Sequence, residues 1–346
     1  MKIKNKYGIL IMRNKCLLFT TLASMSVAAS PIHIDTCEAL LNLEDNTHLD
    51  YEIINNLDCS GIAHSELITF RGNLNGNGHT ISNLTISSSQ NDIGLFSQIH
   101  TGEVRNLTLQ NFNINSQNKK VRTVGGLAGF INGGLVKDVT VTGSSINNSQ
   151  GDWATGLLAG RADNAMIQNV SILNSTLTTT TTTDSRQIGG ALGWIIDGAG
   201  ASNLTVHDVQ ITIKGSGNSK VGGILGNVVN TPLSSLEIID SSLKRNDLGK
   251  NGKNGLLVGQ LDKSTIQHGS IVNVSQNLAL GKYNGIAVGV LLKSNDNLIS
   301  LSDISHNDAD TSLLWHYVNP RETYNTHNLY LDLSNESTLP PPTCQF

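Results

Sequence analysis

Gly125-Gly126-Leu127-Ala128-Gly129 is the stretch around which the 346-residue chain is organised, because it returns at a nearly constant interval. The final positions of successive copies are 32, 31, 33, 33, 33 and 30 residues apart. A fixed period in this range is typical of a solenoid, in which each repeat forms one unit that packs on the next. The copies are Ile93–Ser97, Gly125–Gly129, Gly156–Gly160, Gly189–Gly193, Gly222–Gly226, Gly255–Gly259 and Gly285–Gly289.

A second aliphatic column runs in step with the first, and Val104–Leu109 (VRNLTL) is typical of it. Each period then holds three short β-branched or Leu-rich runs, which are too short for helices. Asn-Gly hairpin turns are absent between most of these runs, which disfavours antiparallel pairs. Three strands per coil, each paired in parallel with the next coil about 4.8 Å away, satisfy the pattern. The sequence therefore predicts an all-β fold, a right-handed parallel β-helix solenoid of about eight coils.

Most copies of this second run carry Asn or Asp at their third position. These two residue types tolerate the left-handed backbone conformation and hydrogen-bond their own backbone, so the column predicts a turn of the chain on every coil. Stacked amides can also form a ladder along the solenoid axis. The members of the column are Asn83, Asn106, Asp138, Asn169 and Asn203.

The Gly-Leu-x-Gly repeats, the lead-in segment Gly72–Ile81 (GNLNGNGHTI) and the Asn-Leu columns resemble the GLUG-motif repeat proteins of bacteria. The resemblance covers about residues 49–292. It implies a secreted or surface protein, since repeats of this family often stand beside adhesin or peptidase modules. No catalytic residue comes with the motif.

Residues 1–29 have the pattern of a secretory signal peptide, with basic residues before an apolar run and Val27-Ala28-Ala29 as small residues at the cleavage site. A membrane anchor is disfavoured because the apolar run Cys16–Ala23 is too short to span a bilayer. The sequence predicts a protein that is secreted or on the cell surface, with the periplasm as an alternative, and that has no transmembrane anchor.

The mature chain is acidic. Removal of the five basic residues in 1–29 leaves 18 Lys and Arg against 27 Asp and Glu, a net charge of about −9 with His neutral. This balance argues against a general nucleic-acid binder.

Both ends of the repeat array are expected to be capped, because an open β-helix end exposes unpaired backbone. Asp35-Thr36-Cys37-Glu38 precedes an apolar run and predicts a short helix within an N-terminal cap at 30–48. The β-helix is expected over 49–305, and a C-terminal cap and tail over 306–346. Export permits disulfides, and Cys37 with Cys59 is the preferred pair. Cys344 would stay free or join another chain.

Variable loops precede each Gly-Leu strand, at 115–123, 147–155, 178–188, 212–220, 244–254 and 279–284. They hold 11 basic residues against three acids, so one edge of the solenoid is predicted to be basic and to suit an anionic partner such as an acidic glycan. The alternative is that lysines simply collect in solvated loops. The basic residues are Lys119, Lys120, Arg122, Arg186, Lys214, Lys220, Lys244, Arg245, Lys250, Lys253 and Lys282.

Aromatic residues supply a second candidate ligand site. Strand alternation places Phe130 and Trp194 on the outer face, two coils and roughly 10 Å apart, where they could stack on sugar rings. Trp153 in its loop is a similar candidate. The same alternation would also expose Ala128 and its counterparts, so that either the face is covered or the glycines distort the alternation.

No catalytic set stands out. Asp163, Asp197 and Asp262 fall near one turn, as the carboxylates of β-helix polysaccharide lyases and hydrolases do, but no coil gathers a close group. His-Glu-x-x-His, the zinc peptidase motif, does not occur in the sequence. No metal and no cofactor is expected.

The leading interpretation is an exported non-enzymatic binding or adhesion protein. It would present its basic loop edge to a glycan or to another component of an envelope or host surface. A polysaccharide lyase or glycoside hydrolase is the alternative, and a structural component of a surface assembly is a third reading.

Overall fold

A computed structural model describes residues 30–116, 122–148, 153–180, 186–215, 217–245, 252–278, 283–294, 299–302, 305–306 and 315–318. The chain divides into two compact units, Met1–Ser30 and Pro31–Phe346, and the described residues belong almost entirely to the second. The predicted signal peptide lies outside the described residues.

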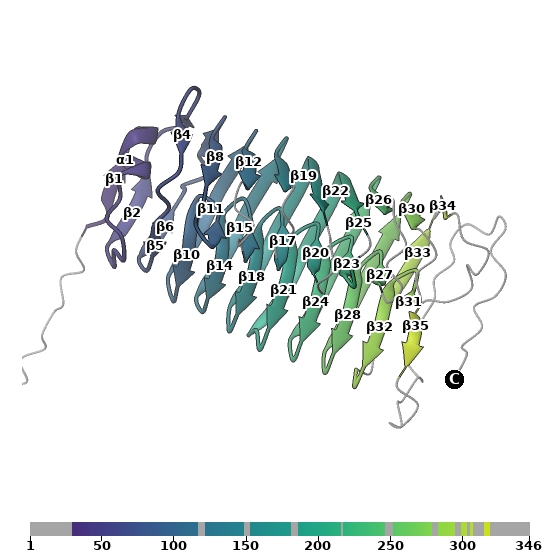
Figure 1. The fold of residues 1–346 in the computed structure, drawn as a ribbon. Coiled ribbons are helices and arrows are strands. Elements are labelled where there is room, and N and C mark those ends of the chain that lie inside the picture. The colour runs from purple at the N-terminus through teal and green to yellow at the C-terminus, as the bar shows by residue number, and fades with distance from the viewer. Residues whose placement is uncertain are drawn as a thin grey trace, which may run out of the picture. The chain divides into compact units, whose positions relative to one another are not determined.

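The second unit is a parallel β-solenoid, as predicted, whose coils stack along one axis (Figure 1). Among the described residues the strands form three sheets of nineteen, nine and seven strands. Seven coils thus have described strands in all three sheets, which differs slightly from the eight coils expected. The handedness stays a prediction.

The nineteen-stranded sheet holds two parallel ladders that merge in the long strands β19 and β22. Its strands are β1 (Ile32–Ile34), β2 (Asp50–Ile53), β3 (Leu57–Asp58), β4 (Ala63–His64), β6 (Asn73–Asn75), β7 (Thr80–Ser82), β8 (Thr85–Ser88), β11 (Glu103–Gln110), β12 (Asn113–Ser116), β15 (Leu135–Thr142), β16 (Ser145–Asn148), β19 (Met166–Thr180), β22 (Gly200–Lys214), β25 (Pro232–Ile239), β26 (Ser242–Arg245), β29 (Thr265–Val272), β30 (Ser275–Leu278), β33 (Ile299–Ser302) and β34 (Ser305–His306).

The other two sheets carry the Gly-Leu repeat and the strand that precedes it. The nine-stranded sheet contains β5 (Thr69–Phe70), β10 (Phe96–His100), β14 (Ala128–Asn132), β18 (Ala159–Asp163), β21 (Leu192–Ile196), β24 (Leu225–Val229), β28 (Val258–Asp262), β32 (Val288–Leu292) and β35 (Trp315–Val318). The seven-stranded sheet contains β9 (Asp92–Ile93), β13 (Thr123–Val124), β17 (Ala154–Gly156), β20 (Gln187–Gly189), β23 (Lys220–Gly222), β27 (Lys253–Gly255) and β31 (Tyr283–Asn284). Because β35 pairs with β32, the nine-stranded sheet extends past residue 305 into the range predicted as a C-terminal cap.

The interior is filled by the aliphatic columns that the repeat predicts. Val104, Val136 and Ile167 stand one above the other in register and are fully buried. At the N-terminal end, Phe70 and Phe96 stack with their ring centroids 4.8 Å apart. Each inward residue thus packs on its equivalents one coil above and below, which buries a continuous apolar core.

The chain turns at residues in the left-handed conformation. Asn106, Asp138 and Asn169 have φ of 53°, 55° and 53° and belong to one column, as predicted. The side-chain amide of Asn169 donates to Asp138 at 2.7 Å, and that of Asn203 donates to Asn169 at 2.8 Å. Amide ladders therefore tie the coils together at this corner.

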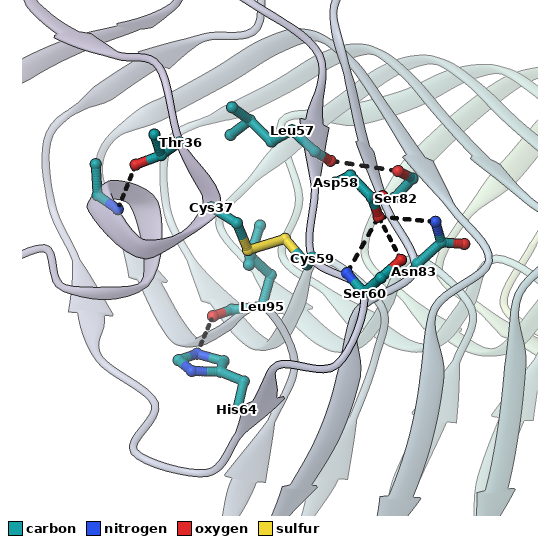
Figure 2. Close-up of a disulfide and its surroundings, with 11 residues drawn as sticks. Thr36, Cys37, Leu57, Asp58, Cys59, Ser60, His64, Ser82, Asn83 and Leu95 are labelled. Atoms are coloured by element: carbon teal, nitrogen blue, oxygen red, sulfur yellow. Dashed lines mark hydrogen bonds between the residues drawn. A yellow bond between two sulfur atoms is a disulfide. The ribbon is translucent and has the colours of Figure 1, made fainter.

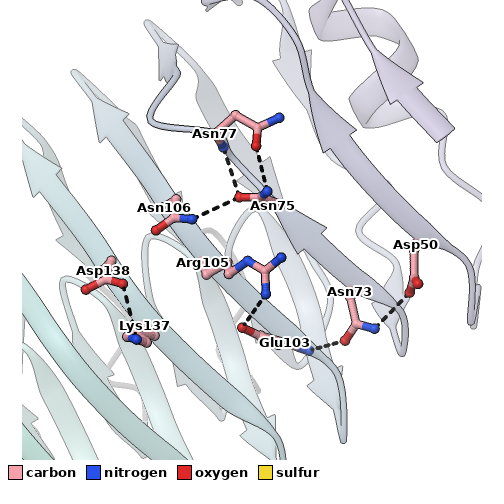
Figure 3. A network of polar contacts seen from close by, with 9 residues as sticks. All are labelled: Asp50, Asn73, Asn75, Asn77, Glu103, Arg105, Asn106, Lys137 and Asp138. Atoms are coloured by element: carbon pink, nitrogen blue, oxygen red, sulfur yellow. Dashed lines mark hydrogen bonds and ion pairs between the residues drawn. The ribbon is translucent and has the colours of Figure 1, made fainter. Parts of the chain in front are cut away.

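The placement of Asn83 in this column is wrong. Ile81 pairs with Leu109, so Asn83 stands beside Asn111 at a different corner. There it donates to Asp58 at 2.9 Å and accepts from Asn111 at 3.1 Å. At the first corner, Asn106 instead donates to Asn75 at 3.1 Å, part of the polar network in Figure 3.

In the six copies from Gly125–Gly129 onward, the last glycine lies against the backbone of the seven-stranded sheet. A Cβ atom built on Gly129 would come within 2.5 Å of the backbone nitrogen of Ile93, and one on Gly160 within 2.5 Å of that of Val124. The two layers touch through these glycines, and Ala128 beside them is fully buried. The chain at Gly94, directly after β9, covers this face, since a Cβ on Gly94 would come within 2.6 Å of the Cα of Ala128. Ala128 is therefore buried although simple alternation would expose it.

The N-terminal cap is part strand and part helix. Strand β1 pairs in parallel with β2, and the five-residue helix α1 (Cys37–Leu41) follows it. The hydroxyl of Thr36 accepts from the backbone N–H of Ala39, which caps the helix as predicted. A disulfide joins Cys37 to Cys59 with 5.5 Å between their Cα atoms (Figure 2).

Candidate functional site

A column of outward side chains crosses the nine-stranded sheet at the predicted aromatic positions. Phe130 on β14, Arg161 on β18 and Trp194 on β21 are in register on three successive coils. The guanidinium carbon of Arg161 lies 5.3 Å from the ring centroid of Phe130 and 4.7 Å from that of Trp194. Arg161 therefore sits between the two rings in cation–π contact with both.

This arrangement contradicts the expected use of Phe130 and Trp194 as two free stacking faces. The space between them is filled by Arg161, whose guanidinium is fixed by bonds of 2.8 and 2.5 Å to the two oxygens of Asp163. On the following coil, the ammonium of Lys220 lies 6.0 Å from the Trp194 ring centroid. The ring of Trp194 is thus covered by Arg161 and Lys220.

Trp153 is the aromatic ring of this group that faces solvent. Its relative exposure is 49%, so about half of the residue's surface is open to solvent. It packs edge-on against Trp194, with ring centroids 6.3 Å apart and planes at 75°. Its carbonyl accepts from the backbone N–H of Gln187 at 2.9 Å, so the backbone beside the ring is held by the next coil.

The predicted basic loop edge can be assessed only in part, and only some of its residues are exposed to solvent. Lys119, Lys120 and Lys250 lie outside the described residues, whereas Arg122 and Lys244 are exposed.

Arg186 and Arg245 are buried, which corrects their assignment as ligand contacts. Arg245, at 3% exposure, donates to Asn254 at 3.2 Å and to the carbonyl of Gly217. Its guanidinium thus supports the backbone of a neighbouring coil.

Lys220 and Lys253 occupy the seam between the seven- and nine-stranded sheets. They are partners in register on β23 and β27, and both are half-buried. The ammonium of Lys253 donates to Gln260 at 2.5 Å. Burial, together with the positive charge of Lys253, lowers the pKa of Lys220 to about 8, against which Asp262 acts. Burial also lowers the pKa of Lys253, and Asp262 again opposes the change.

Sequence reasoning missed Arg161 and Gln260 as members of this site. Both occupy the same outward position of the repeat as Phe130 and Trp194, so the column itself was the signal that could have found them.

Two of the carboxylates considered for catalysis, Asp163 and Asp262, do not form a pair. Asp163 and Asp262 share one column, but Ile196 and Val229 stand between them. Three coil spacings separate their backbones by about 14 Å. This exceeds the ~5–9.5 Å between the two carboxyl groups of glycosidases. Among the described residues, no three His, Cys, Asp or Glu side chains gather as metal ligands.

Replacing Lys220 by Met is expected to stabilise the fold at pH 7 by about 2 kcal/mol, since each unit of pKa shift corresponds to about 1.4 kcal/mol and solvent reduces the effect at a half-buried site. The folded-state pKa is about 8 against 10.5 for the free side chain, so the unfolded state binds the proton more tightly. The destabilisation is therefore fully present below pH 8 and fades as the pH rises toward 10.5. Chemical denaturation at pH 7 and pH 10 measures both effects.

The matched control is Lys244→Met, which removes an exposed lysine from β26 of the nineteen-stranded sheet. It should change stability little at either pH. Equal effects of the two substitutions would contradict the burial of the Lys220 ammonium.

No helix within the described residues has the length and apolar character needed to cross a bilayer. The model of the M26 IgA1-specific metallo-endopeptidase N-terminal region matches residues 34–143.

Two known proteins resemble the chain. Halomucin of Haloquadratum walsbyi is 34% identical over 142 residues, which make up 36% of this chain and 2% of halomucin. The chain therefore spans a very small part of that relative. The crystal structure of a "putative immunoglobulin A1 protease" from Bacteroides ovatus matches 88% of this chain and 84% of its own, with a TM-score of 0.50 and 16% identity. The chain thus shares its fold with that structure and resembles the M26 N-terminal region over its residues 34–143.

Proposed function

We propose that this chain is an exported, non-enzymatic binding protein, secreted or on the cell surface, and that it binds a carbohydrate. The observation that carries the proposal is Trp153, a half-exposed indole that packs on Trp194, whose own ring is flanked by Arg161 and Lys220. A large apolar ring kept partly in solvent beside polar groups is the usual composition of a small-molecule binding surface.

The rigidity of the site supports binding. Trp153 packs on Trp194, which packs on Arg161, which is held by both oxygens of Asp163. A preformed surface loses little conformational entropy when a ligand binds. Halomucin and the immunoglobulin A1 protease are related to this chain by short or distant likeness, and neither determines its ligand.

Trp153→Ala is expected to weaken binding to the polysaccharides that the wild-type protein retains by about 5- to 150-fold, taking for a sugar ring the roughly 1–3 kcal/mol that a nucleobase gains by stacking on an aromatic side chain. Purified mature protein would be passed over immobilised neutral and acidic polysaccharides, and affinities measured by titration. The matched control is Leu49→Ala, which removes an apolar side chain of similar exposure, 53%, at the N-terminal end.

Equal loss in both variants, or unchanged binding in Trp153→Ala, would contradict the site. The size of the polysaccharide should be followed in the same experiment. Shortening of the polymer would replace the binding role by that of a lyase or hydrolase. Failure of the wild-type protein to bind any polysaccharide would favour a structural role in a surface assembly.

A further inference from the structure

Two lysines on successive coils follow the tryptophan pair along the solenoid, and the first of them contacts Trp194. Lys220 and Lys253 pair in register on neighbouring strands, so their backbones are about 4.8 Å apart. Lys220 reaches the ring of Trp194, and Lys253 reaches Gln260, which stands two coils further along the Trp194 column. Both ammonium groups therefore reach the column of the nine-stranded sheet that contains Trp194.

The charges in this seam do not balance. Arg161 and Asp163 neutralise each other through their ion pair. Asp262 attracts both lysines, yet within the described residues neither lysine forms an ion pair with a carboxylate. Two ammonium groups against one carboxylate leave one net positive charge that is half-buried, and such a charge is stabilised by an anion.

Polar atoms of the same columns also lack partners. The indole nitrogen of Trp194, the side-chain oxygen of Asn227 and that of Gln187 are buried with no hydrogen bond among the described residues. Asn227 follows Trp194 in its column, and Gln187 precedes Lys220 in the other. Buried polar groups are nearly always hydrogen-bonded. These three atoms can therefore still bond to water or to a polar ligand.

We propose that Lys220 and Lys253 form an anion subsite for a sugar that carries one negative charge, a carboxylate or a sulfate ester, while the sugar ring packs on Trp153. This inference rests on the proposed function and narrows its ligand to an acidic carbohydrate. A single negative charge matches the net charge of Lys220, Lys253 and Asp262 taken together. A neutral sugar would leave one of the two ammonium charges without a counter-charge.

The test compares polygalacturonate, dextran sulfate and neutral galactan as ligands for the mature protein. In the variant Lys220→Met/Lys253→Met, affinity for the acidic polymers is expected to fall by at least tenfold, with little change for galactan. Lys137→Met, which removes a lysine whose side chain is 42% exposed on β15 of the nineteen-stranded sheet, is the control and should leave every affinity unchanged. Preference of the wild-type protein for polygalacturonate assigns a carboxylate, and preference for dextran sulfate assigns a sulfate ester.

The pH dependence gives a second readout. Burial and then the charge of Lys253 lower the pKa of Lys220 to about 8, while Asp262 opposes them, so Lys220 loses its proton as the pH passes that value. Affinity for the preferred acidic polymer should therefore fall several-fold between pH 7 and pH 9. Lys220→Arg keeps the charge at both values and should flatten this part of the profile.

Two outcomes separate the subsite from the proposed function. If the double variant binds acidic polymers as tightly as the wild-type protein while Trp153→Ala does not, the anion subsite is wrong and the carbohydrate site stands. If Trp153→Ala retains all binding, the proposed function fails and the subsite with it.

Discussion

Gly193→Ala is expected to destabilise the protein by at least about 3 kcal/mol, a large effect for the addition of one methyl group. The new Cβ would lie 2.5 Å from the backbone nitrogen of Thr155 and 2.7 Å from the carbonyl oxygens of Gln187 and Gly160. These atoms belong to paired strands of two sheets, so they cannot move apart without loss of parallel pairing. Because each coil packs only on its neighbours, the damage should interrupt the stack near its middle.

Gly78→Ala is the matched control, because it adds the same methyl group at a glycine where that group would not touch a neighbouring strand. Gly78 has φ of +78°, and a Cβ there would meet no atom within 4 Å. The cost should be about 1 kcal/mol, from the left-handed conformation alone. Thermal and denaturant unfolding of both variants measures the difference. Equal costs would mean that the glycines of the repeat serve backbone conformation and that the two layers do not need this close contact.

The solenoid could be predicted because the same residue types return at the same interval. The interval determines the length of one coil. The inward aliphatic residues, such as Val136 and Ile167, show which face of each strand points into the core. The turns could be predicted for the same reason, since Asn and Asp at a repeated position have a physical cause in the left-handed backbone.

The error over Asn83 shows where pattern matching without spacing fails. The run Ile81–Ile86 resembles the run Val104–Leu109, but the two begin only 23 residues apart, whereas later copies are about 32 apart. Coil length is not constant at this end of the solenoid: Tyr51 pairs with Leu74, 23 residues on, whereas Ile81 pairs with Leu109, 28 residues on. Local resemblance therefore could not identify the partner of Ile81, because the length of its coil was not known from the sequence.

The site could be predicted only in part, because its chemistry depends on contacts between coils. The repeat places Phe130, Arg161 and Trp194 in one column, but it does not reveal that the guanidinium fills the space between the rings. Loop composition likewise groups Lys244 with Arg245, although the first is exposed and the second is buried. The charge of a residue follows directly from the sequence, whereas the burial of its side chain depends on the neighbouring coils.

The Cys37→Ala/Cys59→Ala variant is expected to lose about 3 kcal/mol of stability in the N-terminal cap, because the disulfide closes a loop between cysteines 22 residues apart. The loss should stay local, since a solenoid is held together by contacts between neighbouring coils. Strand β1 and helix α1 would then separate from β2 in a larger fraction of molecules. Hydrogen exchange should become faster over residues 31–58 and stay unchanged in strands β21 and β24.

Opening of the cap has a second consequence, because β1 covers one side of β2. Without β1, the backbone of β2 and the buried side chains of Tyr51 and Ile53 become available to another molecule, and an uncovered strand of this kind recruits further strands. The variant should therefore form oligomers at high concentration, which light scattering detects. The wild-type protein in reductant should behave like the variant, whereas Cys344→Ser should not accelerate exchange in the cap. Unchanged exchange over residues 31–58 in the double variant would show that packing of Leu40 and Tyr51, and not the disulfide, holds the cap closed.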